Sequence, residues 1–164
     1  MKLTDGNKLF LFFRLLYMRK NKSALQKKKD NPNSLYYQRK ALKAWREICV
    51  LRFNNKCAVC NCTEKLEAHH IISKKTCKSI MYSIPNQLLL CTKHHNFFGK
   101  EGTRFSAHKH PIAFYQFIKE KYPDLYFEIW AIDIEQEKKK KITTKDYYDE
   151  FLKILNDLKK NKGI

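Results

Sequence analysis

Residues 67–75 read EAHHIISKK and contain two adjacent histidines, His69 and His70. A neutral imidazole can bind a divalent cation or accept a proton from water near neutral pH. Adjacent side chains of a regular strand point to opposite faces, so a regular strand cannot direct both rings to one centre. The pair therefore predicts two separate roles or an irregular backbone.

Two half-sites for a metal flank this pair: Cys57-x2-Cys60 and Cys91-x2-His94, with 30 residues between them. Thiolates and imidazole in a set of four are typical of tetrahedral zinc, and four protein ligands leave no open position, as in structural sites. Cys62 extends the first half-site to C-x2-C-x-C and is an alternative to Cys60. The spacing predicts a structural zinc ion that fixes the segment between the half-sites.

The chain has 164 residues, enough for one domain with extensions, and carries a formal net charge of +18. Residues 1–50 hold 13 basic and 3 acidic side chains, residues 51–110 hold 10 and 3, and residues 111–164 hold 11 and 10. Such an excess suggests a polyanionic partner, with nucleic acid as the first candidate. The contact surface is predicted in the first two thirds of the chain.

Residues 9–18, LFLFFRLLYM, form a short apolar run that Arg14 interrupts. A bilayer span needs about 20 apolar residues, and the run has no small-residue cleavage site of the kind that follows a signal peptide. We therefore expect no membrane association and an intracellular, cytoplasmic protein. Reduced thiols are expected there, so Cys49 and Cys77 are interpreted as ordinary unpaired cysteines.

Apolar and basic periodicities predict the elements that position these residues. Residues 1–18 are expected to form a short helix and residues 19–34 a basic linker, which together make an N-terminal extension, 1–34. From Leu35 an amphipathic helix is expected, with an opposite, basic face formed by Arg39, Lys43 and Arg46. Strands are predicted within 66–72 and 86–91, and a helix from about Cys91 to Lys100.

The remaining pattern is helical. Pro111 suits a helix N-terminus, Pro123 breaks that helix, and a last amphipathic helix begins near Thr143 or Thr144. The lysine run 138–141 is interpreted as a solvated linker. These features divide the chain into the extension 1–34, a central domain 35–131, and a linker with a C-terminal amphipathic helix, 132–164, which offers a surface for homo-oligomers.

The order Trp45…Arg52, C-x2-C, LEAHHI, NQLLLC and HH resembles the HNH endonucleases in their zinc-containing form, a family common in phages and mobile elements. The resemblance covers about residues 40–100. It implies an α+β fold with a zinc-braced ββα-metal core, to which this chain adds N-terminal and C-terminal helices. For a phage-encoded protein the compartment would be the host-cell cytoplasm.

The resemblance also implies roles for single residues. His70 matches the general base, Asn86 the residue that holds the loop and the base in place, and His95 a ligand of the catalytic metal. His69 falls where many members have aspartate as the other ligand, which is similar to the colicin-type nucleases. The order of His94 and His95 also permits the reverse assignment, with His95 in the zinc site and His94 in the catalytic one.

The chemistry implied is metal-dependent hydrolysis of DNA to 5′-phosphate and 3′-hydroxyl ends. Two neutral imidazoles in place of a carboxylate should weaken Mg²⁺ binding and favour Mn²⁺, Co²⁺, Ni²⁺ or Zn²⁺. A zinc module that binds nucleic acid without cutting it, and a nuclease acting on RNA, remain alternatives. His108 and His110 are interpreted as surface residues that could touch phosphate, with a catalytic role as the less favoured alternative. Further DNA contacts are expected from Lys93, Lys100 and Arg104.

Overall fold

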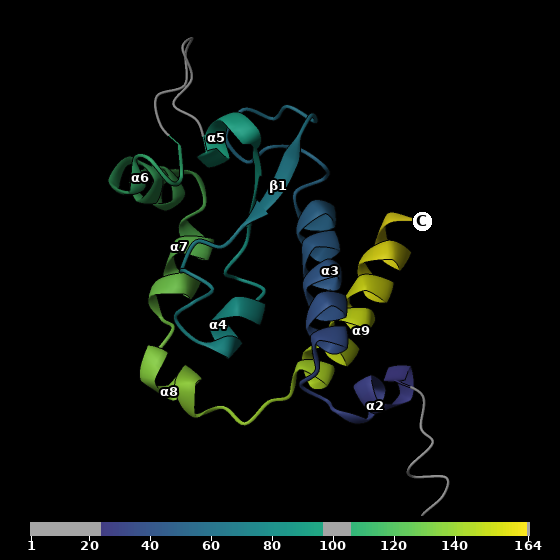
Figure 1. Cartoon of the computed structure of the whole chain (residues 1–164). Helices are drawn as coiled ribbons and strands as arrows, with labels where there is room; N and C mark the ends of the chain where they lie inside the picture. Colours follow the sequence, from purple (N-terminus) through teal and green to yellow (C-terminus); the bar gives the residue numbers. More distant parts are fainter. Residues whose placement is uncertain (1–23, 97–105, 164) are drawn as a thin grey trace, which may run out of the picture.

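The structure, a computed structural model, describes residues 24–96 and 106–163. The helix expected over residues 1–18 lies outside these residues. The chain folds into a helix-rich α+β arrangement with one small antiparallel sheet (Figure 1). In chain order the described elements are α2 (Ala24–Asp30), α3 (Leu35–Arg52), β1 (Leu66–His69), α4 (Lys78–Tyr82), β2 (Leu88–Cys91), α5 (Thr92–Asn96), α6 (Pro111–Lys121), α7 (Pro123–Trp130), α8 (Ile134–Lys139) and α9 (Thr144–Lys162).

The long helices α3 and α9 lie side by side along one flank of the fold (Figure 1). α9 begins at a capping box in which the Thr143 and Asp146 side chains bond each other's backbone N–H groups, and it ends at Gly163 in the left-handed conformation. Its apolar stripe packs against α3 in a cluster that includes Trp45, Ile48 and Phe151. The predicted amphipathic stripe thus forms core within the chain.

The two strands form a hairpin-like pair at the centre of the fold, with Leu66 opposite Cys91 and His69 opposite Leu88. All four residues of β2 are buried. Leu88 and Leu90 pack in a cluster with α6 and α7, whereas Ala68 of β1 packs against the α3–α9 cluster. Helices therefore cover both faces of the β1–β2 pair, and they hold the residues at the ends of the two strands in place.

Several elements differ from the sequence-based expectation. α2 occupies part of the segment expected to be a polar linker, and α8 extends to Lys139 into the lysine run expected to be a solvated linker. α4 and α7 have no counterpart in the predicted elements, because helices of five and eight residues are too short to show a periodicity. The helices from Pro111 and Thr144 are confirmed. Within the described ranges, no helix has the length and apolarity that a bilayer span requires.

Candidate functional site

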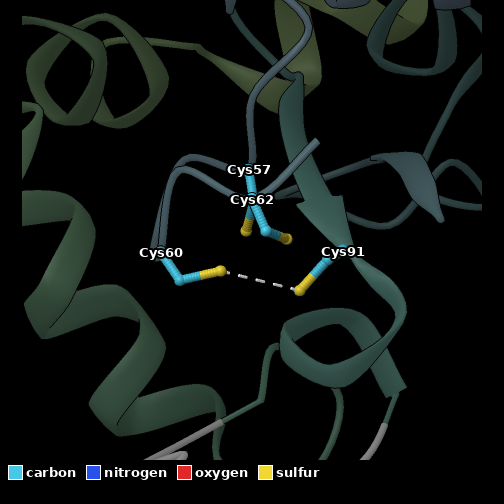
Figure 2. A group of neighbouring side chains, drawn as sticks. All are labelled: Cys57, Cys60, Cys62 and Cys91. Carbon is cyan, nitrogen blue, oxygen red and sulfur yellow. Dashed lines mark hydrogen bonds between the residues drawn. The ribbon is translucent and has the colours of Figure 1, made fainter. Parts of the chain in front are cut away.

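A cluster of four cysteine sulfurs lies beside the start of β1 and the end of β2. Figure 2 shows the side chains of Cys57, Cys60, Cys62 and Cys91 pointing toward a common centre. Their sulfur atoms all lie within 4.8 Å of one another, and the Cys60 and Cys91 sulfurs are 3.9 Å apart. Zn–S bonds of about 2.3 Å in a tetrahedron require sulfurs about 3.8 Å apart, so the cluster has the dimensions of a zinc site.

The turn that carries the first three cysteines is fixed by its backbone. Cys57 N–H donates to Cys62 O at 2.8 Å, and Asn61, with φ of 61°, reverses the chain between Cys60 and Cys62. Ala58 N–H donates to Leu89 O at 2.8 Å and attaches the turn to β2. The two half-sites predicted from sequence are therefore brought together.

His94 also reaches this cluster, but from its edge. Its Nδ1 lies 3.2 Å from the Cys91 sulfur and 3.7 Å from the Cys57 sulfur. The mutually close set nevertheless consists of the four thiols, including Cys62, which the sequence interpretation gave only as an alternative to Cys60. Five donors thus surround a centre that needs four.

The ionisation of the thiols bears on what the cluster can hold. Burial, with the neighbouring thiols, raises the pKa of Cys60 to about 12, and burial raises that of Cys62. Burial also lowers the pKa of the His94 imidazole and keeps it neutral. Burial would raise the pKa of Cys91, but hydrogen bonds from the His94 backbone and the neighbouring thiols outweigh it and lower this pKa. Cys60 and Cys62 therefore do not ionise beside Cys91 without a cation, and a bound metal would displace their protons. The donor set fits zinc.

A second cluster of donors lies at the end of β1. The ligand atoms of His69, His95 and His108 lie within 4.8 Å of one another. His69 is buried and its ring meets that of Phe114 edge-on at 5.3 Å. Burial, followed by the positive charges that the other two rings would carry, lowers the pKa of His69 to about 3, so this imidazole is neutral and available to a metal.

A carboxylate orients one of these rings. Nδ1–H of His95 donates to the Glu67 carboxylate at 2.5 Å. This contact leaves Nε2 of His95 as the acceptor nitrogen of the ring, 3.3 Å from Nε2 of His108. Histidine ligands of metals commonly donate their other N–H to a carboxylate in this way.

His70 points away from this cluster. Its ring stacks on Trp45 of α3 with ring centroids 4.0 Å apart and an angle of 10° between the planes. Nε2–H donates to the backbone oxygen of Met81 at 2.9 Å, which leaves Nδ1 unprotonated and basic. Burial lowers the pKa of His70 against the opposing effect of the Met81 contact. β1 ends at His69, so His70 lies just beyond the strand. The His69 ring contacts Phe114 of α6, whereas the His70 ring stacks on Trp45 of α3.

Asn86 ties the segment after the histidine pair. Its side-chain oxygen accepts from Ile72 N–H at 2.6 Å, and its amide donates to Ile72 O at 2.9 Å and Ile80 O at 3.0 Å. The side chain is fully buried. Asn86 therefore bridges the two ends of the segment between Ile72 and Ile80, adjacent to the carbonyl that holds His70.

The two histidine groups open onto one cleft of about 750 Å³. His69, His70, His95 and His108 line it, as do the basic residues Arg46 and Lys74. The other predicted contact residues that the structure describes are exposed outside the cleft lining: Arg39 and Lys43 on α3 and Lys93 on α5. Lys100 and Arg104 lie outside the described residues.

His108 is the residue that sequence reasoning missed at this cleft. It lies 13 residues beyond His95, after a segment outside the described residues, in a turn rich in lysine and histidine. The one signal in the sequence was a further histidine soon after the motif, and a surface histidine would give the same signal.

The sequence around these clusters is similar to a known protein family. Residues 57–103 match the family model of the HNH endonucleases. No curated protein and no solved structure matches the chain significantly. The matched segment contains both cysteine half-sites, the adjacent histidines, Asn86 and His95. Residues 57–103 of this chain, less than half of its length, are therefore similar to the HNH endonucleases.

Proposed function

We propose that the protein is a metal-dependent endonuclease that hydrolyses phosphodiester bonds of DNA. The observation that carries this proposal is the shared cleft, which the imidazoles of His69 and His95 line together with that of His70. Arg46 and Lys74 add positive charge at its edge, as a phosphodiester requires. The family match supports nuclease chemistry, and the net charge of +18 supports a nucleic-acid substrate.

His69 and His95 would hold a divalent metal, which when bound would stabilise negative charge on the phosphate and on the leaving 3′ oxygen. Glu67 orients His95 for this role. His70 would take a proton from the attacking water through Nδ1, since its Nε2 is committed to Met81. Asn86 would keep the backbone around that base in place. The ββα-metal core of the family would then comprise β1, β2 and α5.

A structural zinc ion would be held by Cys57, Cys60, Cys62 and Cys91. The mutual proximity of the four sulfurs favours Cys62 over His94 as the fourth ligand. His94 would then donate a hydrogen bond to the Cys91 sulfur, 3.2 Å away. Such a site would clamp the turn before β1 to the start of α5 and so fix His95 relative to His69.

The direct test is incubation of the purified protein with supercoiled plasmid and added Mg²⁺, Mn²⁺, Ni²⁺ or Zn²⁺. Conversion to nicked or linear DNA that a chelator stops would support the proposal. DNA binding without cleavage under every metal would contradict it and favour the non-cutting zinc module. Cleavage of labelled RNA with no cleavage of DNA would favour the ribonuclease alternative.

The pH dependence of cleavage follows from the histidine pKa values. Burial lowers the pKa of His69 to about 3 and also lowers that of His70, so both rings stay neutral below the ordinary value of about 6.5. Cleavage should therefore be lost as pH falls, with the midpoint of the acid limb below pH 6.5. Initial nicking rates between pH 4.5 and 8 at saturating metal measure this. A midpoint above about pH 7 would contradict it.

DNA affinity should depend steeply on salt, and α3 should supply part of this dependence. Replacing Arg39, Lys43 and Arg46 with glutamine should reduce the slope of log K against log salt concentration by up to about 2.7, because each lost phosphate contact removes about 0.9. Fluorescence anisotropy with a labelled duplex measures the slope. The control is Lys138→Gln with Lys140→Gln, since these lysines already pair with Glu135 and Glu137. Equal slopes for both variants would remove α3 from the contact surface.

A further inference from the structure

His108 lies beyond the segment that matches the family, yet it meets the two predicted ligands at the cleft. The ring centroids of His69 and His95 are 5.0 Å apart, those of His69 and His108 are 5.0 Å apart, and those of His95 and His108 are 4.8 Å apart. The three rings therefore form a nearly equilateral group, and one ligand nitrogen of each lies within 4.8 Å of those of the other two.

We propose that His108 is a third protein ligand of the metal at His69 and His95, and that this three-imidazole centre selects Ni²⁺, Co²⁺ or Zn²⁺ over Mg²⁺. The inference rests on the proposed function in one respect, that His69 and His95 bind a metal. It adds a ligand from outside the family segment and assigns the class of ion.

The turn that carries His108 is fastened to α5 by its backbone. Ala107 N–H donates to His94 O at 2.8 Å, and His108 N–H donates to His95 O at 3.3 Å. Ser106 is fully buried, and its hydroxyl accepts from Lys109 N–H at 3.3 Å. These contacts fix the backbone at His108 directly over His95, so the imidazole is brought to the cluster by the fold.

The nitrogens of the three rings converge at one point of the cleft. Glu67 accepts from Nδ1–H of His95, which turns the lone pair of His95 Nε2 toward His108 Nε2 at 3.3 Å. In the absence of a metal, Nε2–H of His108 can donate to Nε2 of His95, and a metal ion between the two nitrogens would replace that proton. His69 brings a third nitrogen within 4.8 Å of the other two, and one metal ion could bind all three.

The donor set determines the class of ion. Mg²⁺ prefers carboxylate, carbonyl and water oxygens, whereas imidazole suits Zn²⁺, Ni²⁺, Co²⁺ and Cu²⁺. Among the described residues that line the cleft, Glu67 is the only acidic one, and its Oε2 is engaged by His95. A site of three nitrogens without a free carboxylate offers little to Mg²⁺.

The test is calorimetric titration of the zinc-loaded protein with Ni²⁺ and, separately, with Mg²⁺. The wild type should bind one Ni²⁺ beyond its zinc and bind Mg²⁺ at least ~100-fold more weakly. His108→Ala should weaken Ni²⁺ binding at least ~10-fold, and Glu67→Ala should weaken it about 10-fold through the loss of ring orientation. The matched control is Lys109→Ala, an exposed neighbour in the same turn, which should bind Ni²⁺ as the wild type does.

Unchanged Ni²⁺ affinity in His108→Ala, with an unchanged melting temperature, would overturn the inference. So would Mg²⁺ binding as tight as Ni²⁺ binding in the wild type. If His108→Ala lowered only DNA affinity in the absence of added metal, His108 would be a phosphate contact and the inference would again fail. The proposed function would fail in a different way. Ni²⁺ binding would then depend on His108, but the protein would cut no nucleic acid.

Discussion

We expect the His70→Ala variant to cleave DNA at least ~10²-fold more slowly than the parent, the usual scale for the loss of one acid–base group. The variant should keep its zinc and most of its affinity for DNA, because the His70 ring stacks on Trp45 and bonds the Met81 carbonyl, neither of which belongs to the cysteine cluster or to the basic face of α3. Single-turnover nicking rates measure the loss. Elemental analysis and anisotropy measure the two properties that should persist.

Loss of the His70 ring also has a structural cost, which a second variant controls. Alanine leaves the Met81 carbonyl without its donor, at about 1–3 kcal/mol, and uncovers the ring of Trp45. In His70→Gln the amide can still donate to that carbonyl but cannot accept a proton from water. Both variants should therefore be equally inactive, although their melting temperatures should differ.

The two kinds of histidine should also respond differently to metal. His69→Ala should weaken metal binding, so that excess Mn²⁺ partly restores its cleavage, whereas no metal concentration should restore His70→Ala. A His70→Ala protein that cuts at the parental rate would refute the assigned base. The control for a contaminating nuclease is a second, inactive variant purified in the same way, which must show no nicking.

The second large effect is expected at the cysteine cluster. Cys91→Ser should lose the zinc and the cooperative unfolding transition of the domain. Structural zinc sites contribute about 10–16 kcal/mol of apparent binding free energy, which is as large as the whole stability of a typical domain. Zinc content by elemental analysis and thermal unfolding followed by circular dichroism measure both losses. Cys77→Ser is the matched control, because Cys77 lies outside the cluster and its thiol hydrogen-bonds the hydroxyl of Ser79.

A pair of further variants decides between the two ligand sets. If the four thiols hold the zinc, Cys62→Ser loses it and His94→Ala retains it. The opposite result would show that His94 completes the site, as the C-x2-H spacing predicts. Retention of zinc by Cys91→Ser would contradict both assignments.

The sequence could predict those site residues that lie close together in the chain. The cysteine half-sites, the adjacent histidines and Asn86 follow one another within about 40 residues, so a sequence pattern can identify them before any contact is known. His108 is different because its position depends on how a turn outside the motif docks on α5. Sequence spacing carries no information about that docking.

The elements show the same division. The capping box at Thr143 and the proline at position 111 are local signals, and both helices begin where those signals place them. The apolar stripe of α9 was equally visible, but its partner was not, because an amphipathic helix pairs as well with a second molecule as with its own chain. The packing of Phe151 against the α3 cluster is a tertiary fact.

The pairing of α9 with α3 has a consequence for the order in which the chain can fold. Thr144 bonds the side chain of Asn33, and the two residues are 111 positions apart. Trp45 of α3, on which His70 stacks, shares its buried cluster with Phe151 of α9, so this cluster is complete only after α9 has been synthesised. Contacts of such long sequence separation form late, since their loop entropy must be overcome first. We expect the nascent chain to acquire its base in working position last, so that cleavage activity appears only when α9 has emerged from the ribosome.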